Sequence, residues 1–218
     1  MRLVFISDTH GQHDLVKVPP GDILVHAGDL TNDAGQFALR SFCKWLEAQT
    51  CSRKVFVAGN HDWAFEKWNR LARLMVKEFC PSATYLEDEG VEIDGVKFWG
   101  SPVQPRFLDW AFNRDRGEAI RAHWDMIPDD TDVLVTHGPP YGYLDEVVGR
   151  KDGHLGCRDL YEAVLRVQPT LHSFGHIHSP GGRSHKLVHD NGNSTMLINA
   201  SVVDERYRVV NAPQVFDI

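Results

Sequence analysis

The sequence predicts an α/β protein with mixed sheets, and two observations support this fold class. In the first part of the chain, short apolar runs alternate with segments of helical spacing, and such alternation favours parallel pairing of the strands. Two later stretches instead place strand-like runs on both sides of a turn sequence, Asp94-Gly95 in one and residues 190–193 in the other, as is typical of β-hairpins. Parallel units combined with hairpins predict sheets of mixed direction.

Hydrophobic periodicity predicts the individual elements. Buried strands are expected where a short apolar run ends before a small or polar residue, at Leu3–Ile6, Asp22–His26, Lys54–Ala58, Asp132–Val135 and Thr170–Phe174. Helices are expected over Gly35–Ala48, Trp63–Phe79, Arg116–Met126 and Arg158–Val167. The hairpins are expected over Val91–Trp99 and Lys186–Asn199.

Length and composition limit the class of protein. The 218 residues suffice for one α/β domain with a large core, so we expect a single domain over residues 1–218. No apolar run reaches the roughly 18 residues of a membrane span. The N-terminal apolar stretch stops at Asp8 without a cleavage site, which indicates a strand rather than a signal peptide. We therefore expect a cytoplasmic protein with no membrane partner, whose four scattered cysteines are reduced thiols.

The net charge also limits the partners. The formal charge is −7 with 12 histidines counted as neutral. An acidic surface disfavours a long nucleic acid, because non-specific binding depends on Lys and Arg contacts with phosphates. It does not disfavour a small phosphate ester, since bound cations can reverse the local field.

Five segments share one pattern, in which an apolar strand is followed by a small residue and then by metal-binding residue types. The segments are Ser7–His10, Gly28–Leu30, Gly59–Asp62, Thr136–Gly138 and Gly175–His178. In an open α/β sheet the carboxyl ends of the strands lie along one edge, where ligand sites form. Residues from five strand ends can therefore converge there, although they lie far apart in the sequence.

These segments supply seven candidate metal ligands: Asp8, His10, Asp29, Asn60, His137, His176 and His178. Oxygen and nitrogen donors without thiolate suit Mn²⁺, Zn²⁺ or iron. One tetrahedral ion cannot use so many ligands, so we expect two divalent metal ions that share a carboxylate, with Mn first and Fe or Zn as alternatives. Two cations about 3.5–4 Å apart can clamp the attacking and leaving oxygens of a phosphoryl displacement and lower the pKa of water.

The order D-x-H, G-D, G-N-H-D, H and G-H-x-H resembles the calcineurin-like metallophosphoesterase superfamily, from Asp8 to His178. Residues 100–102, 110–113, 116–117, 136–140 and 198–201 are similar to the metallophosphoesterase-domain-containing proteins, which are related to class III cyclic nucleotide phosphodiesterases. Some of these replace the first His of G-H-x-H by Gly, whereas this chain has His176. The resemblance thus implies a complete two-metal enzyme with a four-layer αββα sandwich of two mixed sheets and the site at one edge.

The resemblance also implies separate roles for the ligands. The first metal would be bound by Asp8, His10 and His178. The second would be bound by Asn60, His137 and His176. Asp29 would bridge the two. His61 would face the leaving group as proton donor or stabilise the transition state, and Asp62, where many relatives have Glu, would orient or polarise nearby groups.

Residues outside the motifs are candidates for contacts with substrate. Asn113, Arg116 and His154 are expected to contact the substrate. His26 could hold a metal ligand in place without touching the metal. Four arginines could hold phosphate oxygens or instead form surface ion pairs: Arg106, Arg114, Arg116 and Arg150. Four aromatic residues could stack on a nucleobase or instead pack the loops: Trp110, Phe112, Tyr141 and Tyr143.

The leading functional hypothesis is a dinuclear phosphodiesterase that hydrolyses a small diester, with a cyclic nucleotide as the example, by direct attack of a metal-bridging hydroxide. A phosphomonoesterase is an alternative, although the chain lacks the G-D-x-x-D-R-G and G-N-H-E segments of serine/threonine protein phosphatases. A nuclease of the same superfamily would normally carry further DNA-contacting domains. A non-catalytic metal or nucleotide binding module is a fourth possibility, but binding alone would not require His61.

Overall fold

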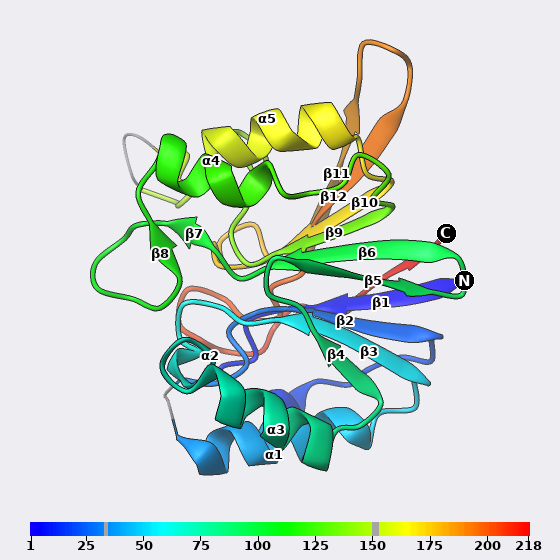
Figure 1. Ribbon diagram of the computed structural model, residues 1–218, viewed down its shortest axis with the longest axis vertical. Coiled ribbons are helices and arrows are strands. Elements are labelled where there is room, and N and C mark those ends of the chain that lie inside the picture. The colour runs from blue at the N-terminus through cyan, green and yellow to red at the C-terminus, as the bar shows by residue number, and fades with distance from the viewer. Residues whose placement is uncertain (33–34, 150–152) are drawn as a thin grey trace.

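Two β-sheets pack face to face, and helices cover the outer face of each (Figure 1). The structure is a computed structural model that describes residues 1–32, 35–149 and 153–218. The layers therefore follow the order αββα, and the predicted fold class is confirmed.

The first sheet has the strand order β13-β1-β2-β3-β4. Its members are β13 (Gln214–Asp217), β1 (Arg2–Ile6), β2 (Ile23–Ala27), β3 (Arg53–Val57) and β4 (Ala83–Tyr85). All neighbours are parallel except β13, which runs antiparallel to β1. The apolar runs predict β1, β2 and β3, whereas the short edge strands β4 and β13 have too little pattern to be predicted.

The second sheet has the strand order β11-β12-β10-β9-β6-β5. Its members are β11 (Arg183–Val188), β12 (Ser194–Asn199), β10 (Leu171–Phe174), β9 (Val133–Thr136), β6 (Val96–Ser101) and β5 (Glu89–Ile93). The four central strands are parallel. The two outer pairs, β5–β6 and β11–β12, are the antiparallel hairpins that the turn sequences predict.

Helices cover the outer faces of both sheets. The first sheet carries α1 (Gln36–Glu47), α2 (Trp63–Lys67) and α3 (Asn69–Phe79), and the second carries α4 (Glu118–Trp124) and α5 (Arg158–Val167). A 3₁₀ turn spans His13–Leu15, and a short pair of strands, β7 (Gln104–Pro105) and β8 (Asn113–Arg114), closes a loop. The single helix predicted over residues 63–79 is wrong, because the backbone breaks at Trp68 (φ −133°, ψ 43°). The apolar periodicity continues through Trp68, so nothing in the pattern marks this break.

The core has three apolar layers, and β1 shows why. Leu3 and Phe5 point into the layer between the sheets, while Val4 and Ile6 point toward the helices. All four side chains are fully buried. Successive side chains of a strand alternate between its faces, so a strand covered on both faces is a continuous apolar run. The long apolar runs of the sequence are thus the central strands of this sandwich.

Two smaller findings concern the cysteines and the helices. All four cysteines are free and buried, and burial raises the pKa of Cys43 to about 12, which leaves it an inert thiol. Among the helices of the described ranges, none combines the length and apolarity needed to cross a membrane.

Candidate metal centre

The chain leaves its central strands through residues in the left-handed backbone region. Asp8 (φ 56°), His10 (φ 45°), Asp29 (φ 54°) and His176 (φ 67°) all have positive φ. For a residue other than glycine this conformation costs roughly 1–2 kcal/mol, and such strain concentrates at functional sites. Each of these residues is a ligand predicted from the sequence, so the strained turns occur where the chain redirects a polar side chain toward the sheet edge.

Hydrogen bonds join the loops from both sheets at this edge. The Asp8 N–H donates to the carbonyl of Gly28 at 2.9 Å, and the Gly175 N–H donates to the carbonyl of His137 at 2.9 Å. The His176 N–H donates to the Asp8 carboxylate, with 3.1 and 3.2 Å to its two oxygens. The ends of β1, β2, β9 and β10 therefore meet, as the motif pattern predicts.

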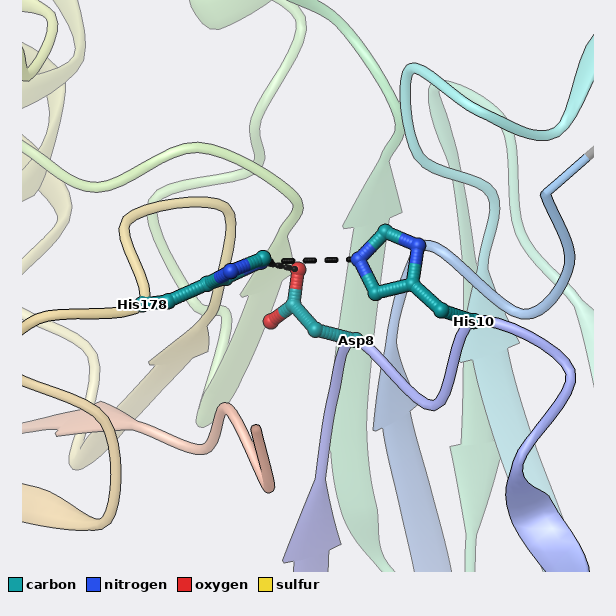
Figure 2. Close-up of side chains that lie close together, drawn as sticks. All are labelled: Asp8, His10 and His178. Carbon is teal, nitrogen blue, oxygen red and sulfur yellow. Dashed lines mark hydrogen bonds and ion pairs between the residues drawn. The ribbon is translucent and has the colours of Figure 1, made fainter. Parts of the chain in front are cut away.

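A first group of ligand atoms comes from Asp8, His10 and His178 (Figure 2). Nε2 of His178 lies 3.4 Å from Oδ1 of Asp8 and 3.4 Å from Nε2 of His10. Burial alone would raise the pKa of Asp8, but the hydrogen bond and charge of His178 hold that pKa below its usual range. Asp8 is thus an ionised carboxylate facing two imidazoles.

A second group comes from Asn60, His137 and His176. Oδ1 of Asn60 lies 2.9 Å from Nε2 of His137 and 2.8 Å from Nδ1 of His176. Burial lowers the pKa of His176 to about 3, so its ring is neutral. An amide oxygen and two imidazole nitrogens therefore converge on one point.

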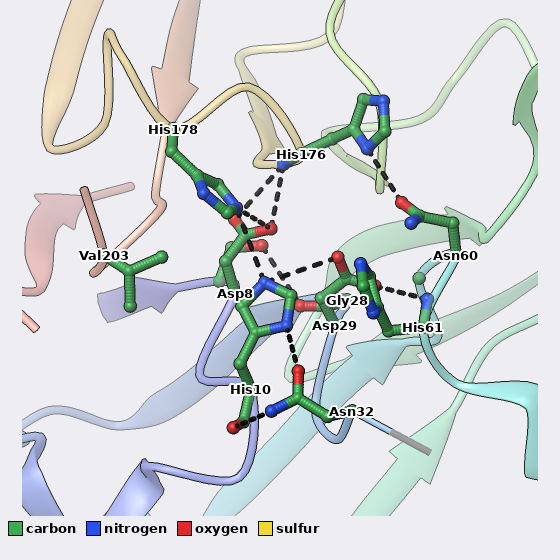
Figure 3. A network of polar contacts seen from close by, with 12 residues as sticks. Asp8, His10, Gly28, Asp29, Asn32, Asn60, His61, His176, His178 and Val203 are labelled. Atoms are coloured by element: carbon green, nitrogen blue, oxygen red, sulfur yellow. Dashed lines mark hydrogen bonds and ion pairs between the residues drawn. The ribbon is translucent and has the colours of Figure 1, made fainter. Parts of the chain in front are cut away.

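Asp29 lies between the two groups (Figure 3). Its Oδ2 is 3.6 Å from Nε2 of His10 in the first group and 3.3 Å from Nε2 of His137 in the second. Its Oδ1 instead accepts the backbone N–H of His61 at 2.8 Å. Burial alone would raise the pKa of Asp29, but the charge and hydrogen bond of His137 hold it well below the usual range. One oxygen of Asp29 is thus fixed by the backbone while the other faces both groups.

The tautomers of two ligands are set by acceptors behind them. The Nδ1–H of His137 donates to the carbonyl of Ala27 at 2.9 Å, and Nδ1 of His10 lies 2.8 Å from Oδ1 of Asn32. The amide of Asn32 also donates to the carbonyl of His10 at 2.9 Å. A hydrogen on Nδ1 leaves the Nε2 lone pair free for a metal. Asn32 is a supporting residue that the sequence does not predict, although its place three residues after Asp29 is a weak signal.

The donor set fits divalent cations. In the described part of the chain, three sets of ligand atoms lie within 4.8 Å of one another: Asp8, His10 and His178; His10, Asp29 and His61; Asp8, Asp29 and His137. Imidazole nitrogens and oxygens converge here, with 2.8 Å from Nδ1 of His176 to Oδ1 of Asn60 and 3.3 Å from Nε2 of His137 to Oδ2 of Asp29. Burial alone would lower the pKa of His137, but the charge of Asp29 raises it to about 9. The site therefore attracts a cation strongly.

Two glycines of the motifs lie where a side chain would have no room. A Cβ at Gly59 would lie 2.3 Å from Oδ1 and 2.4 Å from the backbone N of Asp29. Gly28 has φ +99°, and a Cβ there would lie 2.5 Å from Nδ1 of His137. The small residue before each ligand thus allows neighbouring loops to approach closely.

His61 stands on the wall of a cavity of about 730 Å³, with ligand residues at its floor. The cavity is lined by Asp29, Asn60, His61, His176 and His178, among others. The His61 ring is half-buried, and burial lowers its pKa. His61 is therefore a titratable residue that lines the same cavity as the candidate ligands. It belongs neither to the ligand group that contains Asp8 nor to the one that contains Asn60.

The model of the calcineurin-like phosphoesterase family matches residues 1–180. The chain belongs to this family. It is 38% identical over 238 residues to metallophosphoesterase domain-containing protein 1 of Homo sapiens. The alignment covers 100% of this chain and 71% of the human protein. The protein of the same name in Mus musculus matches equally well. Phosphoesterase family membership and the ligand geometry together make this a metallophosphoesterase.

Solved structures share the fold at low sequence identity. The phosphopantetheinyl hydrolase PptH of Mycobacterium tuberculosis aligns with a TM-score of 0.61 and 16% identity, over 94% of this chain and 90% of that one. A structure described as a novel archaeal phosphodiesterase aligns with a TM-score of 0.50 and 14% identity, over 100% of this chain and 93% of that one. At such identities the likeness shows the calcineurin-like fold alone.

Asp62 lies behind the ligands and not in the cavity. Its carboxylate accepts the N–H groups of Leu30 (3.0 Å), Thr31 (2.9 Å) and Gly59 (2.8 Å). Burial, followed by the charge of Asp29, raises the pKa of Asp62 to about 7. Its carboxylate thus joins the loop of Asp29 to the loop of Asn60, which makes it a positioning residue.

His26 supports the same loops from the core. Its Nε2–H donates to Oγ1 of Thr9 at 3.0 Å, because that hydroxyl donates in turn to the carbonyl of Leu30. Its Nδ1 accepts the N–H of Gly28 at 3.3 Å. Burial lowers the pKa of His26 to about 3, so the ring stays neutral as these bonds require.

The structure places the three predicted substrate residues differently. Arg116 lines the cavity, but its guanidinium donates to the carbonyls of Leu155 (2.9 Å) and Gly156 (2.8 Å). Asn113 stays a prediction as a substrate contact, and its amide donates to the carbonyls of Phe107 and Leu108 and closes their loop.

His154 also stays a prediction as a substrate contact. It lines a smaller neighbouring pocket of about 310 Å³ and does not line the cavity. Its Nδ1 lies 2.6 Å from Oδ1 of Asp145, and this hydrogen bond raises the pKa of His154.

The remaining arginines and aromatic residues are mostly engaged elsewhere. Arg106 lines the cavity and pairs with Asp115 at 2.6 Å, while Nε of Arg114 bonds to His123 at 3.2 Å. Arg150 lies outside the described residues. Of the four aromatic residues, Trp110 lines the cavity. The other three pack elsewhere, Phe112 in the core, Tyr141 under Arg158 and Tyr143 against Tyr161.

Further residues line the cavity but lie outside the sequence motifs, in two loops and in the C-terminal segment. Phe107, Leu108 and Val148 line the cavity and are exposed. Tyr207 packs edge-on against His10 and His178, with ring centroids 4.8 and 5.2 Å apart. Tyr207 also has φ 57°, a strained conformation for a bulky residue. The upper wall of the cavity is therefore largely apolar.

Proposed function

We propose that this chain is a two-metal phosphodiesterase that hydrolyses small phosphodiesters. The observation that carries the proposal is the position of Asp29 Oδ2, which faces His10 in one ligand group and His137 in the other. His61, on the wall of the cavity above them, is the proposed proton donor. Since both groups combine residues from both sheets, we treat residues 1–218 as one catalytic domain.

Each residue of the site would have a distinct role. Asp8, His10 and His178 would hold one cation, Asn60, His137 and His176 the other, and Asp29 would be shared. When bound, the two cations supply hydroxide near neutral pH by lowering the pKa of water, and they neutralise charge on the phosphate. His61 would pass a proton to the departing ester oxygen, so that an alcohol leaves rather than an alkoxide. We expect attack by water in one step, without a covalent intermediate on the chain.

The cavity favours a diester over a monoester. A monoester carries a second negative charge, and arginine guanidiniums are the side chains that match such phosphate oxygens. In the described part of the cavity wall the two arginines are already engaged, Arg106 by Asp115 and Arg116 by backbone carbonyls. The exposed apolar residues Phe107, Leu108 and Val148 instead suit an uncharged organic group. A cyclic nucleotide combines one negative charge with such a group, and it is the substrate that we propose first.

Manganese is the metal that we propose first, because these oxygen and nitrogen donors suit it, and Fe or Zn are alternatives. The alternative functions are a phosphomonoesterase, a nuclease and a binding module without turnover. The charge of −7 opposes the nuclease, and the position of His61 opposes the binding module.

A substrate panel on metal-reconstituted protein tests the proposal. Metal-free protein is loaded with Mn²⁺, Fe²⁺ or Zn²⁺ and given bis-p-nitrophenyl phosphate, p-nitrophenyl phosphate, and 2′,3′- and 3′,5′-cyclic nucleotides. We expect hydrolysis of the diesters to exceed that of the monoester by kcat/KM. Faster monoester hydrolysis would assign a phosphomonoesterase, and binding of nucleotide without any turnover would assign a binding module.

A further inference from the structure

The His61 ring contacts two other rings. The ring centroid of Trp110 is 4.3 Å away with an interplanar angle of 41°, and that of His10 is 4.8 Å away, edge-on at 88°. His10 is fixed by Asn32 through a hydrogen bond of 2.8 Å. The His61 ring thus packs against both a fixed candidate ligand and an indole.

In the described structure, no hydrogen bond orients the imidazole of His61. The hydrogen bonds of this residue are made by its backbone, whose N–H donates to Asp29 and whose carbonyl accepts from the N–H of Trp63. Most catalytic or metal-binding imidazoles are oriented by an acceptor on one ring nitrogen. For His61, ring packing takes the place of such an acceptor.

The backbone around Trp110 is tied to the segment that carries His61. The Ala111 N–H donates to the carbonyl of Asn60 at 3.2 Å. The carbonyl of Ala111 accepts from Nε2 of Gln104 at 3.1 Å, and the Phe112 N–H donates to Oε1 of Glu66 at 3.0 Å. Because these bonds lie directly after Trp110, the backbone that carries its indole has a fixed place relative to the segment of His61.

We propose that Trp110 is a positioning residue that holds the His61 imidazole toward the leaving group. The inference rests on the proposed function. As water attacks phosphorus, the bond from phosphorus to the leaving oxygen breaks and its electron pair stays on that oxygen. His61 gives a ring proton to that oxygen, which forms the O–H bond of the alcohol, and the ring regains a proton from water. The indole does not serve as a free platform for a nucleobase on the side that His61 covers.

The proposal predicts a dependence on the leaving group. A leaving p-nitrophenolate is a weak base and needs little help, whereas phenolate is more basic and gains from a proton in the transition state. A misplaced His61 should therefore slow a phenyl ester more than a p-nitrophenyl ester. A merely structural loss would slow both esters by the same factor.

The experiment compares methyl phenyl phosphate with methyl p-nitrophenyl phosphate in Mn²⁺-loaded protein. For Trp110→Leu we expect kcat on the phenyl ester to fall roughly tenfold more than on the nitrophenyl ester, since small misplacements of catalytic groups are costly. Trp110→Phe keeps a ring and should retain most of the ratio. His61→Ala should show the larger loss, and adding Trp110→Leu to it should not change the ratio further.

Phe107→Leu is the matched control, because Phe107 lines the same cavity but makes no ring contact with His61 within the described residues. It should change both rates by one factor. Equal slowing of the two esters by Trp110→Leu, or a further fall of the ratio in the double variant, would overturn the proposal.

A second measurement does not depend on turnover. In metal-free protein the Trp110 ring current should shift the NMR signals of the His61 ring protons, which are assigned by their absence in His61→Ala. Trp110→Leu should remove that shift, while Phe107→Leu should not. Unchanged His61 signals in Trp110→Leu would overturn the inference. Wild-type protein that hydrolyses neither ester with any metal would instead overturn the proposed function, and the NMR comparison would still decide whether Trp110 positions His61.

Discussion

The backbone N–H of His61 donates a hydrogen bond of 2.8 Å to Oδ1 of Asp29. The two residues follow different strands, β2 and β3, whose loops meet at the sheet edge. This bond uses one carboxylate oxygen and so determines which oxygen faces the ligand groups. The same peptide that presents the proposed proton donor thus orients the proposed bridging ligand.

Asp29→Asn should abolish the shared ligand. The amide oxygen of the new residue would keep the bond to the His61 N–H, so the NH₂ group would face the nitrogens of His10 and His137. A donor there cannot bind a cation. We expect metal affinity and diester hydrolysis to fall on the order of a hundredfold or more, since even supporting residues cost roughly 10–100-fold. Metal content after dialysis and the rate on bis-p-nitrophenyl phosphate provide the measurement.

The control for this substitution is Asp130→Asn, an exposed carboxylate paired with Lys97. It should leave metal content unchanged. If Asp29→Asn retained two metal ions per chain, Asp29 would not be the bridging ligand.

Asn32 should contribute to metal affinity without touching the metal. Its Oδ1 lies 2.8 Å from Nδ1 of His10 and so keeps the Nε2 lone pair free. Asn32→Leu removes that acceptor and should weaken Mn²⁺ binding roughly 10–100-fold. Asn32→Asp retains an acceptor and should bind within a few-fold of wild type. Calorimetric titration of the metal-free variants distinguishes the two, and equal affinity for wild type and Asn32→Leu would exclude this role.

The convergence of the candidate ligands could be predicted from the sequence because they follow closely after buried strands. Asp8 follows β1, Asp29 follows β2 and His176 follows β10, and the carboxyl ends of such strands share an edge. The strained φ angles at these residues were not predictable, since they depend on loops from the other sheet. The assignment of the ligands to two metals rests on the family resemblance rather than on spacing, and it stays a prediction.

The loop residues could not be placed from the sequence. Asn113 belongs to a segment shared with relatives, yet its amide is used by the carbonyls of Phe107 and Leu108. Trp110 faces His61, and Tyr207 reaches the site from beyond the last motif. Loop side chains are positioned by non-local contacts, and no periodicity reports those contacts. Residue type and order therefore predict which strand-end residues converge better than they predict how loop side chains pack.

Gly59→Ala should damage the centre by sterics alone. The new Cβ would lie 2.3 Å from Oδ1 and 2.4 Å from the backbone N of Asp29, so the backbone of one loop must move. We expect a loss of about 1–3 kcal/mol in the free energy of unfolding, as for overpacked sites, together with weaker metal binding. Urea unfolding of the metal-free protein measures the first effect. Gly138→Ala, whose Cβ would meet nothing closer than 3.5 Å, is the control for stability. Equal stability of Gly59→Ala and wild type would contradict the predicted clash.

His172 should make the fold sensitive to acid. Its side chain is fully buried, and its Nε2 bonds to Oγ1 of Thr136 at 2.9 Å. Its Nδ1 has no partner in the described structure, so a proton there would have no acceptor. Burial lowers the pKa of His172 from 6.5 to about 3. The unfolded chain therefore binds a proton that the folded chain excludes, and the stabilising contribution is present above the unfolded pKa and lost as the pH falls toward the folded one.

His172→Gln tests this, because glutamine can donate to Thr136 but does not titrate. Between about pH 7.5 and about pH 5, wild type should lose about 2 kcal/mol more unfolding free energy than the variant, at about 1.4 kcal/mol per pH unit below the unfolded pKa. Urea unfolding of metal-free protein at both pH values gives the difference. His154→Gln is the opposite control, since the hydrogen bond to Asp145 raises the pKa of His154 and its contribution is lost as the pH rises. A pH dependence that is the same in wild type and His172→Gln would show that His172 is not the group that titrates on unfolding.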